Sequence, residues 1–321
     1  MAHELSIRAN GFTEMAFVGQ TPWHGLGQTI DPNADLNTWA VQAGMDWSID
    51  SAPAQFVDSR GNNQFIANQY VLHRSDNGFP LSTVSNRYKP VQPNEVLEFF
   101  HDLIEENGFK MHTAGTLRGG KRMWALAETG KFGEISKADG IGAFLLLSTS
   151  CDRTLATTAR FTTVRVVCNN TLSMAVNREN QHCISFSHIQ KFNHEIVKQK
   201  LATEVQQFGS FLEMGKVLRK QKMNQDHAKK FLSNLITPMM QVKGENAKVE
   251  ENRTYKKILA LFKEEAKGVE MAGFTKWGML NAVTEYYDHH NPARNTDSRL
   301  DTSWFGTGEK IKNKALEILL A

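Results

Sequence analysis

The sequence is poor in cysteine and proline and has no long hydrophobic run. Three cysteines among 321 residues, with no C-x-x-C pair, exclude a disulfide framework and predict a reducing compartment. The longest apolar stretch, residues 141–147, is far shorter than the roughly 20 residues that cross a bilayer. The first residues lack a basic start followed by an apolar run, so no secretory signal is expected and the predicted location is the cytoplasm.

The sequence also lacks a large excess of either positive or negative charge. Lys and Arg total 37 against 34 Asp and Glu, a net charge of +3. This balance excludes a charge-saturated, histone-like nucleic-acid binder but leaves local cationic sites open. Residues 1–186 hold 15 basic and 18 acidic residues, residues 187–270 hold 16 and 10, and residues 271–321 hold 6 and 6. The positive excess therefore lies in the middle segment.

Hydrophobic periodicity in residues 1–186 predicts strands with a few helices. Short alternating or β-branched runs, such as residues 64–67 and 160–168, are typical of strands. The segment from residue 94 to 107 predicts a helix, because its apolar residues share one face, acidic residues lie in its first turn and Gly108 follows it. This part is therefore expected to be a β-rich domain.

The remainder of the chain is predicted to be helical. In residues 187–270, apolar residues recur every three or four positions, and one helix is expected to begin near Gln225 and to end near Pro238. Residues 271–321 are expected to form a helical segment that packs back on the core. The fold class predicted is α+β, with a mixed or antiparallel sheet and packed helices followed by a mainly helical part.

The segment TPWHGLG, residues 21–27, is the first candidate site. It presents Trp23 and His24 on a tight turn, because its proline restricts one backbone angle and its glycines allow unusual ones. One interpretation is a loop that stacks on a base or faces a substrate. The other is a tryptophan that closes the end of the sheet beside a surface histidine.

Two further segments interleave cations with aromatic rings. Gly119-Gly120 lies between two strand-like runs and predicts a hairpin turn that carries positive charge. Flexible cations hold the phosphates of single-stranded nucleic acids, and aromatic rings stack on their bases. A cationic turn that only aids solubility is the alternative. The candidate binding residues are Arg87, Tyr88, Lys89, Arg118, Lys121, Arg122 and Trp124.

The stretch from residue 145 to 176 predicts a strand with an arginine on each face. Its polar residues are candidates for phosphate or base contacts, and a salt bridge to Asp152 is the alternative for the arginines. The candidates are Arg160, Arg165, Asn169 and Asn170. No G-x-S-x-G elbow and no paired metal-ligand spacing accompanies them, so no catalytic residue, metal or cofactor is assigned.

Several separated motifs resemble the family catalogued as domain of unknown function 932. The resemblance runs nearly end to end and is weakest between about residues 190 and 270. That family usually has His-Asp-Gly where this chain has Cys151-Asp152-Arg153, which argues against a catalytic histidine there. The resemblance implies a phage or plasmid origin and a bacterial cytoplasm, without a settled activity. The motifs are TPWHGLG, RYKPVQ, TAGTLRGGKRMWALAE, LLLSTSCDRTLATTARFTTVRVVCNNTLSMAV, NAVTEYYDHH and RLDTSWFGTGEKIKNKALEILL.

The leading hypothesis is a non-enzymatic DNA-binding accessory protein that holds single-stranded DNA during recombination or replication. Under this hypothesis the protein can form a homo-oligomer and can bind recombination proteins of a phage or its host. No association with a membrane is expected. One alternative is an enzyme acting on a nucleotide or nucleic acid, with a pocket formed by His24, Asp152, Arg160 and Arg165. Another is an interaction protein that blocks a host factor.

Overall fold

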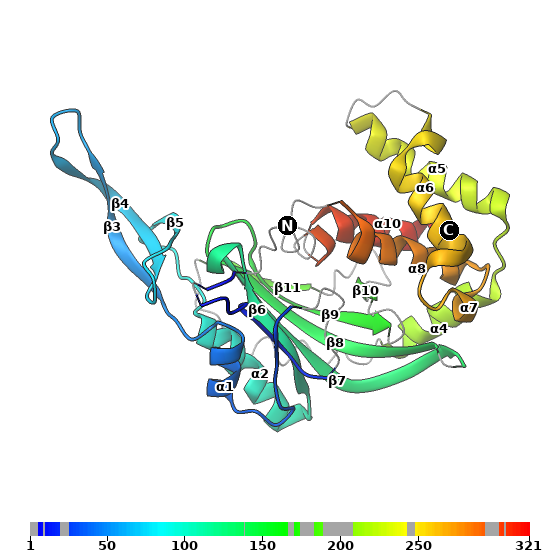
Figure 1. Ribbon diagram of the computed structural model, residues 1–321, viewed down its shortest axis with the longest axis horizontal. Coiled ribbons are helices and arrows are strands. Elements are labelled where there is room, and N and C mark those ends of the chain that lie inside the picture. The colour runs from blue at the N-terminus through cyan, green and yellow to red at the C-terminus, as the bar shows by residue number, and fades with distance from the viewer. Residues whose placement is uncertain are drawn as a thin grey trace. The chain divides into compact units, whose positions relative to one another are not determined.

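The computed structural model describes residues 6–8, 10–19, 26–137, 139–165, 170–173, 183–188, 208–242, 248–292, 302–304 and 306–321. Strands dominate the described chain up to residue 186, and helices dominate it from residue 208 onward (Figure 1). This confirms the predicted α+β class. The chain divides into two compact units, the first formed by residues 1–130, 145–160 and 183–202, the second by residues 131–144, 161–182 and 203–321. The domain boundaries expected at residues 186 and 270 stay a prediction.

The larger sheet has the strand order β10-β9-β8-β7-β6-β1-β2, and β11 pairs with β9. β1 pairs with β2 in parallel and with β6 antiparallel, and β6 and β7 form an antiparallel pair. β8 is buried along its whole length, which explains why its sequence is apolar rather than alternating. The strands are β1 (Met15–Phe17), β2 (Gln28–Thr29), β6 (Lys110–Leu117), β7 (Arg122–Ser136), β8 (Asp139–Ser150), β9 (Thr157–Arg165), β10 (Asn170–Ser173) and β11 (Cys183–Phe186).

The turn between β6 and β7 is the predicted glycine hairpin. A short 3-10 turn, η1 (Arg118–Gly120), joins the two strands, with φ of 71° at Gly119 and 94° at Gly120. These angles favour glycine. A Cβ atom at Gly120 would also lie 2.7 Å from the ring of Trp47, so a larger residue does not fit there.

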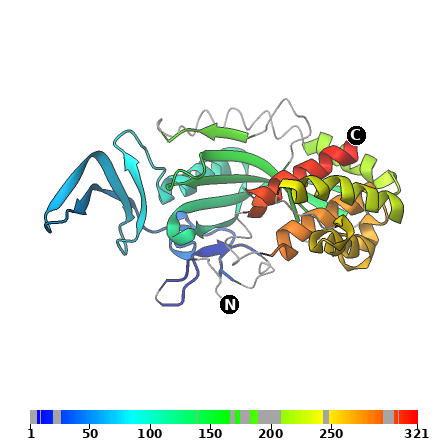
Figure 2. The same cartoon turned by 90° about the horizontal axis from the view of Figure 1, so that it is seen from above.

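A second, antiparallel sheet has the order β3-β4-β5, with β3 (Ile49–Val57), β4 (Asn63–Arg74) and β5 (Pro80–Ser85). β5 pairs with residues 69–73 of β4, and residues 63–65 of β4 pair with β3 alone, beyond a register shift between Pro53 and Gln55. The outer part of β3 and β4 extends as a two-stranded ribbon beyond β5 (Figures 1 and 2). Asp58 orders the turn of the ribbon, because its Oδ1 accepts the backbone N–H groups of Arg60 and Asn62 at 2.9 and 3.0 Å.

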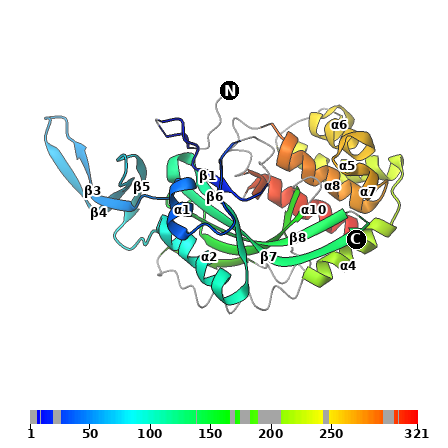
Figure 3. The same ribbon diagram turned by 60° about the horizontal axis from the view of Figure 1, so that its bottom comes forward.

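Two helices of the first unit, α1 (Leu36–Gln42) and α2 (Pro93–Asn107), pack against each other, and α2 also contacts β6 (Figure 3). Asp35 caps α1 by accepting the backbone N–H of Thr38 at 2.7 Å. α2 confirms the helix predicted over residues 94–107, and Gly108 after it has a φ of 68°. Trp39 of α1 and Phe99 and Phe100 of α2 are fully buried, which anchors both helices to the core.

The second unit is mainly helical. α8 is its central element, because every residue from Trp277 to Glu285 is buried. The indole of Trp277 donates to the carboxylate of Asp139 at 2.9 Å and so satisfies a buried acid. The helices are α4 (Phe208–Lys220), α5 (Gln225–Val242), η3 (Val249–Glu251), α6 (Arg253–Ala260), the π-helical turn η4 (Leu261–Glu265), α7 (Val269–Ala272), α8 (Lys276–Glu285), the π-helical turn η5 (Tyr286–His290) and α10 (Thr307–Leu320).

The helix predicted to begin near Gln225 does so, and Asn224 caps it by accepting the backbone N–H of His227 at 2.9 Å. The predicted end near Pro238 is wrong, because α5 continues through this proline to Val242. Proline inside a helix costs about 3 kcal/mol. Burial of apolar residues on both sides of the proline, including Ile236 and Met240, offsets this cost.

A buried polar network joins η5, the turn that follows α8, to α10 in the second unit. The ammonium of Lys312 donates to Asp288 at 2.7 Å and to Ser303 at 3.2 Å, and the Ser303 hydroxyl donates to Asp288. All three side chains are buried, and each charge has an opposite charge and a hydrogen bond. Gly308 permits the start of α10 to lie close to Thr302, since a Cβ atom at residue 308 would lie 2.9 Å from the carbonyl oxygen of Thr302.

Candidate functional site

Three loops of the first unit meet at one place. They are the turn after β5 (residues 86–89), the turn between β6 and β7 (residues 118–121) and the loop between β8 and β9 (residues 151–156). The backbone N–H of Cys151 donates to the carbonyl of Lys121 at 2.9 Å. The Tyr88 hydroxyl donates to the carbonyl of Ser150, also at 2.9 Å. Hydrogen bonds therefore bring together loops that are far apart in the sequence.

Six cations lie on or directly after these loops, and we call them the cationic cluster. Its members are Arg87, Lys89, Arg118, Lys121, Arg122 and Arg153. Five of the six are predicted site residues, and Arg153 is an addition from the structure. Asp152 is the one acidic residue on the three loops, and four of the cations are exposed. The cluster therefore forms a positively charged surface.

Arg118 and Arg153 both have a left-handed backbone conformation, with φ of 56° and 65°. This conformation costs roughly 1–2 kcal/mol for a residue with a Cβ atom. Among the described residues other than glycine, only Asn68 shares a positive φ. Strained residues of this kind concentrate at binding and catalytic sites. Two exposed arginines held in this way on adjacent loops are the clearest functional feature of the cluster.

Arg122 forms the buried base of the cluster. Its guanidinium donates to the Thr154 hydroxyl at 2.9 Å and so links the start of β7 to the loop between β8 and β9. Burial, and after it the charge of Arg118, lower the pKa of Arg122 to about 10, while the charge of Asp152 opposes the decrease. The side chain stays positive at neutral pH and supplies charge beneath the exposed cations.

The neighbouring Cys151 and Asp152 are poorly suited to covalent chemistry. Burial raises the pKa of the Cys151 thiol to about 12, so the nucleophilic thiolate is scarce at neutral pH. Burial raises the pKa of Asp152 as well, but hydrogen bonds from Thr154 outweigh it and hold that pKa below its ordinary value. Asp152 is therefore an ionised acceptor for Thr154, at 3.0 Å from the backbone N–H, and it orders the loop.

Aromatic side chains border the cluster. Tyr88 stacks on His188, with ring centroids 4.9 Å apart and planes inclined by 20°. Its hydroxyl is bound to Ser150, so this ring supports the loops. Phe79 is 43% exposed and lies beside the turn of η1, with the Lys121 ammonium 5.9 Å from its ring centroid. A cation next to an exposed aromatic ring is a combination that binds a nucleobase and its phosphate.

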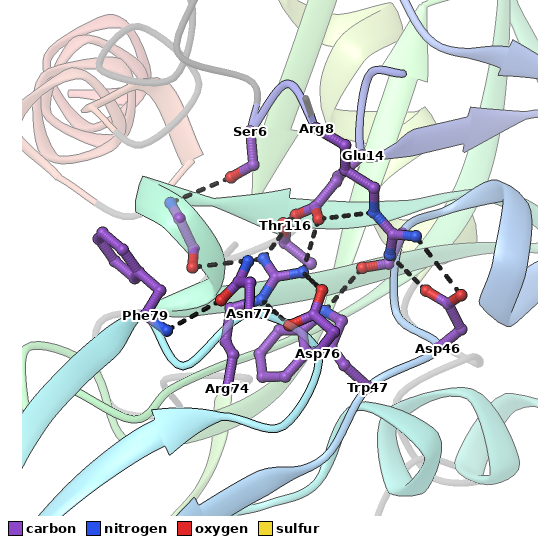
Figure 4. A network of polar contacts seen from close by, with 12 residues as sticks. Ser6, Arg8, Glu14, Asp46, Trp47, Arg74, Asp76, Asn77, Phe79 and Thr116 are labelled. Atoms are coloured by element: carbon purple, nitrogen blue, oxygen red, sulfur yellow. Dashed lines mark hydrogen bonds and ion pairs between the residues drawn. The ribbon is translucent and has the colours of Figure 1, made fainter. Parts of the chain in front are cut away.

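A buried ion-pair network supports the turn that carries Arg118 (Figure 4). Glu14 accepts two hydrogen bonds from the Arg74 guanidinium, at 2.7 and 3.0 Å, and both side chains are almost fully buried. Arg74 also donates to Asp76, and its guanidinium carbon lies 4.2 Å from the ring centroid of Trp47. Burial disfavours the charge of Arg74, but the hydrogen bonds to Glu14 and Asp76 outweigh it and raise the pKa of Arg74.

The network reaches the turn itself. Arg74 donates to the carbonyl of Gly119 at 3.4 Å, and the hydroxyl of Ser6 accepts the backbone N–H of Gly119 at 3.0 Å. Arg8 joins Glu14 at 3.1 Å and also pairs with Asp46. Charged side chains from the N-terminal segment and from the end of β4 therefore position the backbone beside Arg118.

The other predicted site residues do not lie on the three loops, or lie outside the described residues. Trp124 is fully buried in β7, so its ring has no exposed face and the predicted stacking on a base does not fit its position. Arg160 lies in β9 opposite Cys183. Arg165 and Asn170 pair across β9 and β10 in the second unit, and their side chains lie outside the described residues. Trp23, His24 and Asn169 lie outside them as well.

Sequence reasoning missed three contributors to the site. Arg153 was noted only because the family usually has glycine at this position. A glycine there indicates a left-handed backbone conformation, which Arg153 indeed adopts. Phe79 gave no signal, since it follows a turn as an isolated aromatic residue. The pair of Glu14 and Arg74 is separated by 60 residues, and no local pattern predicts their contact.

Replacing Arg153 with glycine is expected to raise the free energy of unfolding by up to about 1 kcal/mol, because glycine adopts a positive φ without strain. The same change removes one exposed cation, so an anionic ligand should bind a few-fold more weakly. Chemical denaturation and a binding titration measure the two effects. Arg153→Lys keeps the charge and the strain and should change neither quantity. A glycine variant less stable than the parent would contradict a strained Arg153.

No group of three His, Cys, Asp or Glu side chains is placed to hold a metal ion within the part of the chain that the structure describes. No helix among the described residues is long and apolar enough to cross a membrane.

The fold and the cluster define an α+β protein with a cationic surface formed by three loops. The family model described as Domain of unknown function (DUF932) matches residues 80–304, and the chain belongs to this family. All six members of the cationic cluster lie within the matched residues. No curated protein and no solved structure matches the chain.

Proposed function

We propose that this chain is a DNA-binding accessory protein that holds single-stranded DNA at the cationic cluster. The observation that carries the proposal is the pair of exposed arginines, Arg118 and Arg153, held in strained conformations on adjacent loops. With Lys121 and Lys89 they offer flexible cations within one surface, as phosphate binding requires. A recombination or replication step of a phage or plasmid is the context that the family resemblance supports.

A single strand is the favoured form of DNA because of the aromatic residue beside the cations. Phe79 presents an exposed ring next to Lys121, and unpaired bases stack on such rings regardless of their sequence. In a duplex the base faces are covered by their neighbours. We include Phe79 in the proposed binding set in place of the buried Trp124.

Binding is favoured over catalysis by the chemistry of the loop that follows β8. Burial raises the pKa of the Cys151 thiol to about 12, and Asp152 accepts hydrogen bonds from Thr154. Neither group is activated as a nucleophile or as a general base at neutral pH. The proposal therefore assigns the loop a role in positioning cations.

Titration of a fluorescent oligothymidine of roughly 20 nucleotides by the full chain tests the proposal. About four phosphate contacts predict that the association constant falls roughly 50-fold between about 50 and 200 mM salt, because counterions released on binding must be recovered. A duplex of the same length should bind more weakly. Absence of binding at about 50 mM salt would overturn the proposal, and binding that is independent of salt would overturn the role of the cations.

A further inference from the structure

His188 lies shortly after β11, and its buried ring contacts two of the three loops that carry the cationic cluster. Its Nε2 atom lies 3.2 Å from the carbonyl oxygen of Leu155, on the loop between β8 and β9. Its Nδ1 atom lies 3.4 Å from the carbonyl oxygen of Lys89, on the turn after β5. The backbone N–H of Lys89 also donates to the carbonyl of His188 at 2.6 Å. One histidine therefore bridges the loops that carry Lys89 and Arg153.

A neutral imidazole cannot donate to both of these carbonyl oxygens. It has one N–H group and one lone pair, so one nitrogen donates while the other directs its lone pair at an oxygen that is itself an acceptor. An imidazolium has two N–H groups, one for each oxygen. The contacts at His188 therefore fit the protonated ring better than the neutral ring.

Tyr88 makes a further contact that favours the protonated ring. The rings of Tyr88 and His188 are stacked, with centroids 4.9 Å apart and planes inclined by 20°. The face of an aromatic ring is electronegative and attracts a cation that lies over it. The Tyr88 hydroxyl donates to Ser150, which holds the phenol ring in place beside His188.

Burial opposes the positive charge in the free protein. It lowers the pKa of His188 below the ordinary value, and the hydrogen bonds to Leu155 and Lys89 only partly offset the decrease. His188 is therefore mainly neutral at neutral pH, and the cations nearby add no attraction for a proton. The titratable and charged side chains of the two loops are Arg87, Tyr88, Lys89, Cys151, Asp152 and Arg153.

Bound phosphates would reverse this balance. Negative charge close to a histidine favours the imidazolium, and phosphates held by Lys89 and Arg153 would also offset the positive charge of the loops that the ring contacts. Binding of a proton and binding of an anion then strengthen each other by the same factor. The protonated ring would donate to both loops at once and so fix their positions before the strand binds.

We propose that His188 is a positioning residue of the cationic cluster and that it takes up a proton when the cluster binds single-stranded DNA. This role rests on the proposed function, because the phosphates supply the charge that retains the proton. The free protein holds His188 neutral at neutral pH, so the proton is taken up from solution on binding. The affinity for single-stranded DNA should therefore increase as the pH falls.

Fluorescence anisotropy with oligothymidine tests the proposal at constant ionic strength, because thymine and the phosphates keep their charge between about pH 6 and 8. The association constant of the parent protein should increase about fivefold or more from about pH 8 to about pH 6, within the tenfold per pH unit that one proton allows. His188→Gln keeps one N–H donor but takes up no proton, and its constant should change less than about twofold.

His227→Gln is the matched control. It removes an exposed histidine on α5, in the other compact unit, and should keep the increase of the parent. A purely structural role of His188 predicts instead that His188→Gln weakens binding equally at both pH values, and this result would overturn the proposal. Circular dichroism checks that both variants fold.

NMR titration of the histidine rings in the parent protein measures the proton uptake directly. The pKa of His188 should be higher in the complex with oligothymidine than in the free protein, because the phosphates favour the imidazolium. An unchanged pKa, or binding that is independent of pH, would contradict the role of His188 and leave the proposed DNA binding intact. Absence of binding at both pH values would overturn the proposed function and the role of His188 together.

Discussion

Glu14→Gln is expected to lower the free energy of unfolding by about 3–5 kcal/mol, the usual result of removing one partner of a buried ion pair. Glu14 is 1% exposed and accepts hydrogen bonds from Arg74, Arg8 and Thr116. The neutral amide removes the buried one of the two carboxylates that pair with Arg74 and leaves it the more exposed Asp76. The NH₂ group of the amide also cannot accept the bonds that the carboxylate accepted. Denaturation by urea, followed by tryptophan fluorescence, measures the change.

Two further variants sharpen this test. Asp46→Asn removes the more exposed partner of Arg8 and should cost less than about 1 kcal/mol, as surface ion pairs do. Replacing Glu14 and Arg74 together with leucine should recover part of the loss, because no unpaired charge stays buried. A loss below about 1 kcal/mol in Glu14→Gln would show that the network contributes little to the turn that carries Arg118.

Reversing three charges of the cationic cluster, with Arg118→Glu, Lys121→Glu and Arg153→Glu in one chain, is expected to lower the affinity for oligothymidine by about 100-fold or more at 50 mM salt. Each reversal removes a phosphate contact and adds a repulsive charge. The salt dependence should become shallower, because fewer counterions are released on binding. Fluorescence anisotropy measures both quantities.

A matched triple variant separates a local site from the effect of net charge. Lys229→Glu, Lys230→Glu and Lys256→Glu change the net charge by the same amount and affect exposed lysines on α5 and α6 of the helical unit. This variant should lose less than about threefold in affinity, since these lysines do not belong to the proposed phosphate-binding cluster. Equal losses in the two triple variants would contradict a site at the cluster.

Local patterns predicted the elements of the fold well. The helix α2 and its closing Gly108, the glycine turn between β6 and β7, and the start of α5 at Gln225 were all confirmed. Each depends on residues within about one or two turns of one another, where periodicity and capping act. The end of α5 was missed at Pro238, because burial of the helix on both sides of the proline is a tertiary effect.

The candidate site was predicted only in part. Cations of two segments were identified because they interleave with aromatic residues, and the structure brings these segments together. Trp124 was assigned to the surface together with the neighbouring cations, but it is fully buried. The alternation of side chains along β7 shows which residues share a face, but not which face the rest of the protein covers. The role of Arg153 depends on the conformation of its loop, which residues from two other loops determine.

By itself the sequence determined the α+β class, the positions of several helices and of the glycine turn between β6 and β7, and the concentration of cations and aromatics in two segments. These properties arise from neighbours along the chain. Only the tertiary structure decided that the turns carrying Arg118 and Arg153 meet and that Glu14 and Arg74 support them from within. The physical reason is that burial and ion pairing depend on distances in space between residues distant in sequence.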